Sequence, residues 1–237
     1  MVVRVAERAN EASNVSRVVV ATDDQRIHDA VCDAGFESVM TSYDHTSGSD
    51  RLAEAAAVLG GEFDLIVNVQ GDEPLISPRT IERAISALVE DKEAAISTTC
   101  EAIGETADVL SPDVVKVVTD SRGYALYFSR SPIPYLRDEA RRLGSLAAAL
   151  EAEPALLARF RKHTGLYVYR REFLSEFARL PQGHLERLES LEQLRILESG
   201  ARIRVVEVEE SSIGVDTAED LERVRAIYKL KDTSMHD

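Results

Sequence analysis

The sequence has little that is typical of secreted, membrane or nucleic-acid-binding proteins. Its 237 residues include only two cysteines, Cys32 and Cys100, with no metal-ligand spacing and no histidine pair near them. This scarcity indicates buried, reduced thiols in a cytoplasmic protein. No run of about 18 apolar residues is present, so no membrane span is expected. The N-terminus lacks a basic stretch followed by an apolar one, so no export signal is expected either.

Basic charge is also scarce. Lysine and arginine number 28 against 42 acidic residues, which gives a formal net charge of −14. A surface that replaces phosphate counterions needs a basic stripe, so a nucleic-acid partner is disfavoured. An anionic ligand remains possible, and local cations would then matter. The proportions of apolar and charged residues, 44% and 30%, are ordinary for a globular protein.

The first half of the chain alternates short apolar runs with helical patterns. Gly35 is placed to stop the first of these helices, and Ser77 followed by Pro78 opens the third. This β-α-β-α-β order predicts an α/β fold with a doubly wound, mostly parallel sheet. The expected strands are 17–22, 36–41, 64–69 and 94–100, and the expected helices are 25–34, 49–59 and 77–90, with Ser49 as the cap of the second.

The rhythm changes after residue 114. Two strand patterns flank the turn 120–123 and predict a hairpin. We interpret residues 115–180 as an insert on a single domain, 1–237, and as a dimerisation surface. Around and after it we expect strands 114–119, 124–128, 166–170 and 203–208, a helical stretch 138–161 that contains Pro154, a helix 185–199, and a last helix from the cap Thr217 to about 230.

An opening strand is absent. The chain begins with a helix pattern in which Val2, Val5, Ala6 and Ala9 face one side. Doubly wound folds normally start with a strand whose loop holds phosphates at the next helix N-terminus. We therefore expect this sequence to lack that unit.

The segment Gln70-Gly-Asp-Glu-Pro74 directly follows the apolar run 64–69, which we expect to be a strand covered on both faces. In open parallel sheets the ligand crevice lies outside the carboxyl ends of the strands, so this segment occupies the expected place. Asp72 is suited to a hard cation such as Mg²⁺, which needs only one or two carboxylates in addition to substrate phosphates. A turn aspartate without a ligand is an equally open reading.

Asp216 is a second carboxylate between an apolar run and a helix. Taken alone it is typical of a helix N-cap. Together with Asp72, from a separate strand end, it can hold one metal ion.

The loop 44–51 before the second helix is polar and contains glycine. Its hydroxyl and backbone groups suit a base or sugar edge, and Arg51 can reach a carbonyl or a phosphate. An ordinary loop between a strand and a helix has the same composition, so both readings stay open.

Two further groups of polar residues lie later in the chain. His163 and Tyr167 share a strand face only if the strand extends back to them, because four residues is an even spacing. Glu189, Glu192 and Gln193 share a helix face, which is also what a solvated charged face looks like. A core stripe that includes Leu188 would lie opposite.

Taken together, these segments resemble the CMP-KDO synthetase family, the 3-deoxy-manno-octulosonate cytidylyltransferases. The resemblance covers nearly the whole chain in the right order, and the combination of QGDEP, YALYFSR and GVDT is far more specific than any one motif. The matching segments are 44–54, 67–75, 115–135, 162–169, 191–197 and 214–224.

The resemblance implies that CTP and KDO react to give CMP-KDO and diphosphate, with Mg²⁺, in the cytoplasm, for lipopolysaccharide assembly. It also implies a homodimer. By match of motif, Asp72 and Asp216 would bind Mg²⁺, and Ser47, Gly48 and Arg51 would contact the cytidine nucleotide. The reaction would be attack of the anomeric hydroxyl of KDO on the α-phosphorus of CTP. Such a transfer depends on positioning and charge neutralisation and needs no protein nucleophile.

The same matching places the remaining candidates around the sugar. The residues that would line the KDO site are Gln70, His163, Tyr167, Glu192 and Gln193.

The beginning of the chain departs from the family pattern. Members of this family open with a strand and a basic, glycine-containing loop that holds the triphosphate, and we expect that segment to be missing before Met1. A sequence that starts at an internal methionine and a truncated product are the two explanations. Two other functions remain open: a cytidylyltransferase for another acidic sugar, and an inactive paralogue that binds an acidic sugar or dimerises.

Overall fold

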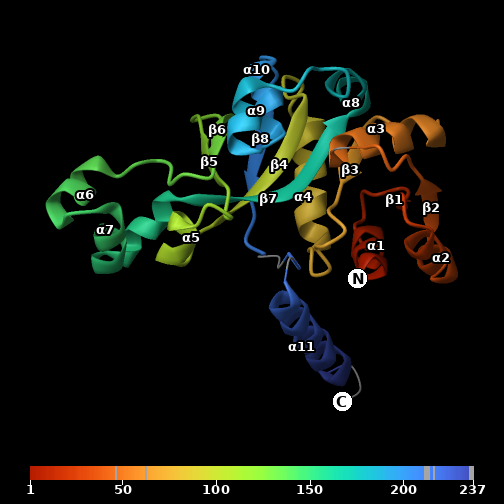
Figure 1. Cartoon of the computed structure of the whole chain (residues 1–237), viewed down its shortest axis with the longest axis horizontal. Coiled ribbons are helices and arrows are strands. Elements are labelled where there is room, and N and C mark those ends of the chain that lie inside the picture. The colour runs from red at the N-terminus through yellow and green to blue at the C-terminus, as the bar shows by residue number, and fades with distance from the viewer. Residues whose placement is uncertain (46, 62, 211–213, 216, 235–237) are drawn as a thin grey trace. The chain divides into compact units, whose positions relative to one another are not determined.

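The computed structural model forms two compact units. The first comprises Met1–Glu82 and Glu210–Asp237, and the second Arg83–Glu209, so that the boundary falls within the helix α4 (Pro78–Glu90). Figure 1 shows their elements. The structure describes all residues except 46, 62, 211–213, 216 and 235–237, and it describes only the backbone of 230–234.

The first unit contains a pair of parallel strands, β1 and β2, with Val19 opposite Glu37. Between them, the carboxylate of Asp24 accepts a hydrogen bond from the backbone N–H of Arg26 and starts α2, and Gly35, at φ +82°, follows its end. The elements of this unit, besides the start of α4, are α1 (Val2–Asn10), β1 (Val19–Thr22), α2 (Gln25–Asp33), β2 (Glu37–Met40), α3 (Gly48–Leu59), β3 (Leu65–Asn68) and α11 (Ala218–Ser234).

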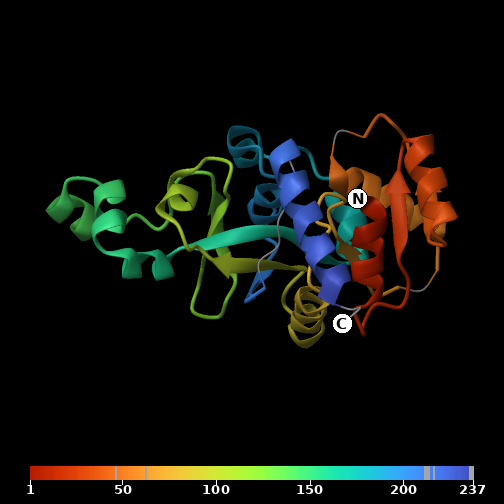
Figure 2. The same ribbon diagram turned by 90° about the horizontal axis from the view of Figure 1, so that it is seen from below.

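The opening helix α1 buries Val5, Ala6 and Ala9, as its spacing predicts. It lies beside the last helix, α11, where the guanidinium of Arg4 stands 5.3 Å from the ring centre of Tyr228. Figure 2 shows the two helices side by side. The first and last helices of the chain therefore meet at this contact.

The second unit is built on a mixed sheet with the strand order β6-β5-β7-β4-β8. Strands β4 and β8 are parallel, whereas the pairs β4–β7, β5–β6 and β5–β7 are antiparallel. The α/β class predicted from the sequence is confirmed. The elements of this unit, besides the end of α4, are β4 (Ile96–Ala102), α5 (Thr106–Leu110), β5 (Lys116–Thr119), β6 (Ala125–Ser129), α6 (Arg137–Leu143), α7 (Leu146–Ala152), η1 (Pro154–Arg159), β7 (Arg161–Arg170), α8 (Arg171–Phe177), α9 (His184–Glu189), α10 (Gln193–Glu198) and β8 (Ile203–Glu207).

The predicted hairpin is formed by β5 and β6. The carboxylate of Asp120 accepts from the backbone N–H groups of Arg122 and Tyr124, and Gly123 supplies the left-handed conformation of the turn at φ +82°. Beyond the hairpin, the helical stretch is divided at Gly144 and Pro154 into α6, α7 and η1. These short helices enclose an apolar cluster around Val109, Leu150 and Phe160.

The prediction of one helix over 185–199 is wrong. Ser190 has φ +53°, so α9 ends there, and α10 starts at Gln193 in a new direction. The two helices are joined by a buried ion pair in which Arg195 Nε donates to Glu186 Oε2 at 2.7 Å. Leu188, expected in the core stripe, is 69% exposed, because the break turns its face away from the unit.

Two cationic side chains are held by backbone carbonyls in the second unit. The ammonium group of Lys116, a fully buried residue, donates to the carbonyl oxygens of Ser111, Val114 and Arg130. Burial, reinforced by the positive charge of Arg130, lowers the pKa of Lys116. Arg170 donates to the carbonyls of Leu88 and Asp91 at 2.8 Å each, and so caps the end of α4.

Both cysteines are free thiols. Cys100, on β4, is buried as predicted, and burial raises the pKa of its thiol to about 12. The prediction of burial is wrong for Cys32, which is exposed on α2 with its Sγ 3.8 Å from Nε2 of His28.

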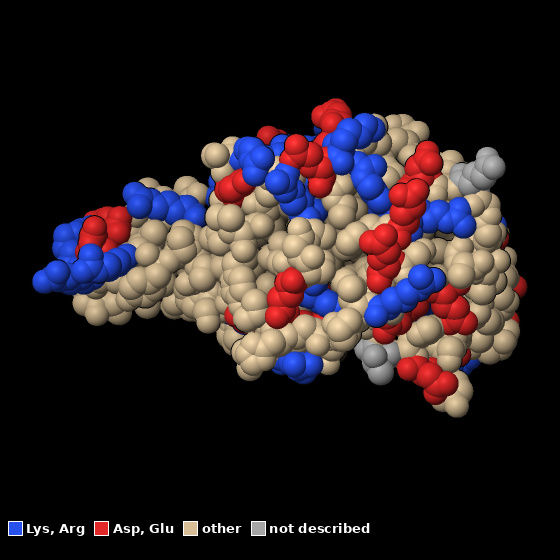
Figure 3. Space-filling model, turned by 90° about the horizontal axis from the view of Figure 1, so that it is seen from above, with Lys and Arg blue, Asp and Glu red and all other residues tan. Residues whose placement is uncertain are grey.

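Charged side chains of both signs lie on the surface. Figure 3 shows lysine and arginine interspersed with aspartate and glutamate on the face in view. Within the described part of the chain, no helix combines the length and apolar character that crossing a membrane requires.

Candidate active site

The segment Gln70–Pro74 forms a fixed loop after β3. The N–H of Glu73 donates to the carbonyl of Gln70 at 3.2 Å and closes a turn around Asp72. Pro74 is buried, and its carbonyl accepts from the hydroxyl of Tyr228 at 2.6 Å. Gln70 is exposed and Asp72 is half-buried, so both side chains are available at the turn. The strand before them is half-buried throughout, and the prediction that it is covered on both faces is wrong.

The loop meets the segment that carries the second predicted aspartate. The backbone N–H of Val215 donates to the carbonyl oxygen of Asp72 at 2.9 Å. A side-chain carbon on Gly214 would stand 3.7 Å from Oε1 of Glu73, so this segment packs closely on the loop. Asp216 itself lies outside the described residues, but its neighbour in the chain is in contact with Asp72.

This arrangement fits a magnesium ion bound together with a nucleotide. Among the residues that the structure describes, the carboxylate of Asp72 has no hydrogen-bond or ion-pair partner, and no group of three or more histidine, cysteine or acidic side chains is placed to hold a metal. Mg²⁺ does not need such a group, since one or two carboxylates and substrate phosphates suffice. Asp72 and the segment joined to it meet this requirement.

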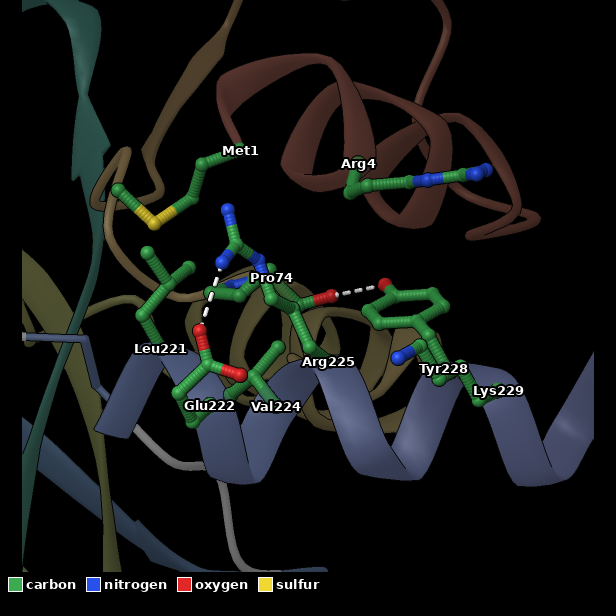
Figure 4. Close-up of a pocket in the computed structure, with 9 residues that line it drawn as sticks. All are labelled: Met1, Arg4, Pro74, Leu221, Glu222, Val224, Arg225, Tyr228 and Lys229. Atoms are coloured by element: carbon green, nitrogen blue, oxygen red, sulfur yellow. Dashed lines mark hydrogen bonds and ion pairs between the residues drawn. The ribbon is translucent and has the colours of Figure 1, made fainter. Parts of the chain in front are cut away.

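A pocket of about 560 Å³ lies between α1 and α11, and the loop residue Pro74 is part of its lining. Figure 4 shows the Tyr228 hydroxyl directed at the Pro74 carbonyl and the ion pair between Glu222 and Arg225 on its lower wall. None of the predicted site residues is among the described residues that line it. These are Met1, Arg4, Pro74, Leu221, Glu222, Val224, Arg225, Tyr228 and Lys229.

The predicted nucleotide contacts lie where β1 and β2 end. Ser47, and not Ser49, caps α3, because its hydroxyl accepts from the N–H of Asp50 at 3.1 Å. Gly48 is the first residue of that helix and is exposed. Arg51 donates to the hydroxyl of Thr41 at 2.7 Å.

Arg51 is also paired with Asp23, a residue that motif matching did not select. Its Nη2 lies 2.8 Å from Asp23 Oδ2, and this hydrogen bond lowers the pKa of the Asp23 carboxyl. Asp23 follows β1 directly, and an acidic residue at the carboxyl end of a parallel strand is the signal that identifies it. The pair fixes Arg51 at the strand ends.

The strand β7 carries two of the predicted sugar contacts on one face. It begins at Arg161, earlier than predicted, so it includes both His163 and Tyr167. Their ring centres are 5.3 Å apart, and the ring of Phe128 meets that of His163 edge-on at 5.0 Å. Loss of solvent lowers the pKa of His163 to about 3 and raises that of Tyr167. Both rings are therefore neutral at pH 7.

The start of α10 carries two more of the predicted sugar contacts. Gln193 is its first residue and is only 5% exposed, and Glu192 is its N-cap residue. The negative charge of Glu192 is one of the causes that raise the pKa of Tyr167, which places the two residues in the same region.

Glu189 does not share this helix face. Its carboxylate accepts from the Ser129 hydroxyl at 2.7 Å and from the N–H of Arg130 at 2.9 Å, so it fixes the end of β6. The break at Ser190 ends α9, so Glu189 lies on a different helix from Gln193.

Thr98 contacts a predicted site residue, and no sequence pattern pointed to it. It is fully buried on β4, and its hydroxyl lies 2.9 Å from Nε2 of His163. A threonine in an apolar strand carries no signal of such a contact, because the contact depends on how β4 pairs with β7.

Comparison with known proteins gives a consistent result. A family model described as cytidylyltransferase matches residues 1–203. The chain is 54% identical over 98% of its length to a 3-deoxy-manno-octulosonate cytidylyltransferase of Geobacter sulfurreducens, 89% of which is covered. It is 53% identical, again over 98% of its length, to the protein of the same name from Geotalea daltonii, with 88% covered.

Two solved structures are similar to this fold. CMP:2-keto-3-deoxy-manno-octonic acid synthetase complexed with CTP matches with a TM-score of 0.84 and 42% identity, over 96% of this chain and 87% of the other. 4-Diphosphocytidyl-2C-methyl-D-erythritol synthase of Anaerococcus prevotii matches with a TM-score of 0.58 and 14% identity, over 96% and 86%, and shares the fold alone.

Proposed function

Because the chain belongs to the 3-deoxy-manno-octulosonate cytidylyltransferases, we propose that it joins CTP and KDO to give CMP-KDO and diphosphate, a step that serves lipopolysaccharide assembly. The substrates are those in the names of its relatives. The structural observation that carries the proposal is the hydrogen bond from Val215 to Asp72, because it unites the two aspartate segments at one strand end.

In this reaction the anomeric oxygen of KDO forms a bond to the α-phosphorus of CTP, and the bond from that phosphorus to the diphosphate breaks. The chain contributes positioning and charge. The loop 70–74 is held by the hydrogen bonds to Val215 and Tyr228, so Asp72 stands on a fixed backbone. Asp72 and Asp216 would hold Mg²⁺, which neutralises the developing phosphate charge when bound.

The nucleotide would be recognised at the ends of β1 and β2. Ser47 and Gly48 open α3, and a helix N-terminus favours an anionic or polar ligand. Arg51 is fixed by Thr41 and Asp23, which orients its guanidinium without leaving it as a free cation. We assign these three residues to cytidine binding.

We assign sugar binding to Gln70 and to four residues of the second unit. His163 is neutral at pH 7, so it offers a hydrogen bond and no positive charge to an acidic sugar. Tyr167, Glu192 and Gln193 add a hydroxyl, a carboxylate and an amide. Such a set suits a ligand rich in hydroxyl groups.

We also propose a homodimer in the cytoplasm. Leu126 and Tyr135, both within the segment 115–180, are 62% and 63% exposed, so each offers an apolar side chain that a second copy would cover. Two free thiols agree with a reducing compartment. Light scattering behind a sizing column would give the mass; a monomer at micromolar concentration would contradict the dimer.

The test of the activity is diphosphate release from CTP with KDO and Mg²⁺. We expect turnover that a chelator abolishes, and we expect Asp72→Asn to lower kcat about 10²–10³-fold, as for other electrostatic groups. Asp64→Asn is the matched control, since Asp64 is exposed at the other end of β3. Turnover with another acidic sugar and none with KDO would contradict the substrate, and an unaffected Asp72→Asn variant would contradict the site.

A further inference from the structure

The hydroxyl of Thr98 connects the imidazole of His163 with a backbone carbonyl. Its Oγ1 donates to the carbonyl oxygen of Leu166 at 2.6 Å, and it lies 2.9 Å from Nε2 of His163. A hydroxyl has one proton to donate. Because the carbonyl takes that proton, the contact with His163 requires the imidazole to donate. The proton of the neutral ring is therefore on Nε2.

This carbonyl lies at an irregularity of the sheet. On β4, Thr98 pairs with Tyr167 and the next residue, Thr99, pairs with Thr164. Two residues of β7, Gly165 and Leu166, are thereby left out of the ladder between the strands. The carbonyl of Leu166 belongs to one of these two residues, and the Thr98 hydroxyl donates to it at 2.6 Å. The bulge thus fixes the direction in which this hydroxyl points its proton.

The fixed proton determines what His163 can bind. With Nε2 protonated, Nδ1 is the nitrogen that carries a lone pair. Among the described residues Nδ1 has no hydrogen-bond partner. A neutral acceptor of this kind accepts a hydrogen bond from an O–H or N–H group. It has no proton to donate to a carboxylate.

We propose that Thr98 is a positioning residue that holds His163 as the Nε2–H tautomer, so that Nδ1 accepts a hydrogen bond from a hydroxyl group of the sugar substrate. The choice of ligand rests on the proposed function, because the sugar is the substrate assigned to His163. His163 therefore accepts a hydrogen bond from a hydroxyl group of the acidic sugar, and other residues bind the sugar carboxylate.

The first test needs no substrate. Nitrogen NMR of the histidine side chains in the full chain distinguishes a protonated from an unprotonated ring nitrogen. We expect His163 to show one tautomer, protonated on Nε2, in the natural protein and in Thr98→Ser, and a mixture in Thr98→Val. Protonation on Nδ1 in the natural protein would overturn the proposal even if the variants failed to fold, and so would an unchanged tautomer in Thr98→Val.

The second test separates binding from the chemical step. In Thr98→Val we expect KM for KDO to rise about tenfold, which is about 1.4 kcal/mol, with KM for CTP unchanged and kcat within about twofold. Thr98→Ser should retain the natural values. Thr99→Val is the matched control, because Thr99 is equally buried on β4 but its hydroxyl meets that of Thr164 instead.

The outcomes distinguish this proposal from the proposed function. A parallel rise in both KM values, or the same change in Thr99→Val, would show a merely structural role and overturn it. If the natural protein does not turn over KDO at all, the proposed function fails. The nitrogen spectra of Thr98→Val then decide whether Thr98 sets the tautomer.

Discussion

The imidazole of His163 lies between Phe128 and Tyr167, with Nε2 2.9 Å from the hydroxyl of the buried Thr98, so its surroundings favour the uncharged ring. Its pKa of about 3 in the folded protein is below the usual 6.5. Between these values the unfolded chain binds the proton and the folded chain does not. The free energy of unfolding therefore falls as the pH drops from about 6.5 towards 3, by up to about 1.4 kcal/mol per pH unit.

This dependence can be measured with His163→Gln. Urea unfolding at pH 7 and pH 5 should show a smaller loss of stability in the variant than in the natural protein, by about 2 kcal/mol. His184→Gln, which changes an exposed histidine on α9, is the control and should lose as much stability as the natural protein. Equal losses in His163→Gln and the natural protein would contradict the assignment of a neutral imidazole.

Lys116 tests how much a buried cation contributes when it is bound only by carbonyls. We expect Lys116→Met to lower the free energy of unfolding by at least about 3 kcal/mol, because three carbonyl oxygens lose their donor and each unsatisfied group costs about 1–3 kcal/mol. Urea unfolding with Lys92→Met, an exposed lysine, as control measures this. A loss no larger than that of the control would show that the carbonyls find other partners.

At the scale of the elements, the break between α9 and α10 offers a test of backbone strain. Ser190 is the only described residue other than glycine with a positive φ, +53°. We expect Ser190→Gly to raise the midpoint of urea unfolding, by up to about 1 kcal/mol in stability, because glycine adopts this conformation without a steric penalty. Ser199→Gly, at φ −74°, should lower it by about 0.5–1 kcal/mol. Equal effects of the two substitutions would contradict the strain.

Local signals predicted most helices and strands. Gly35 and the pair Ser77-Pro78 mark boundaries through groups that are adjacent in the chain, and the structure has these elements within a few residues. The break at Ser190 could not be predicted, since neither glycine nor proline marks it. The short helices α5 and α8 were not predicted either.

The candidate site was predictable to a similar degree. Motif matching identified residues at strand ends and on β7, but it could not identify partners that long-range pairing supplies. Thr98 meets His163 across 65 residues of sequence, and Asp23 meets Arg51 across 28. Both contacts depend on strand register, which no single segment encodes.

At the scale of the whole molecule, the net charge of −14 governs the response to salt. Excess charge of one sign destabilises a compact state by self-repulsion, and salt screens it. We expect Tm to rise as sodium chloride increases from about 10 mM to about 150 mM. Salt also screens the exposed ion pairs, but the resulting loss of stability is small, since each pair contributes about 0–1 kcal/mol. Calorimetry at the two concentrations measures the change, and a fall in Tm would contradict the prediction.

The two thiols are divided between the two units: Cys32 is exposed on α2 in one, and Cys100 is buried on β4 in the other. A thiol reagent should therefore modify Cys32 in the folded protein and reach Cys100 only when β4 opens. The rate of the second reaction, followed by mass spectrometry, reports how often the strand that carries Thr98 separates from its neighbours. Cys100 thus serves as a chemical probe for the opening of β4 in the second unit. Cys32, in the first unit, serves as the internal reference for the reactivity of an exposed thiol.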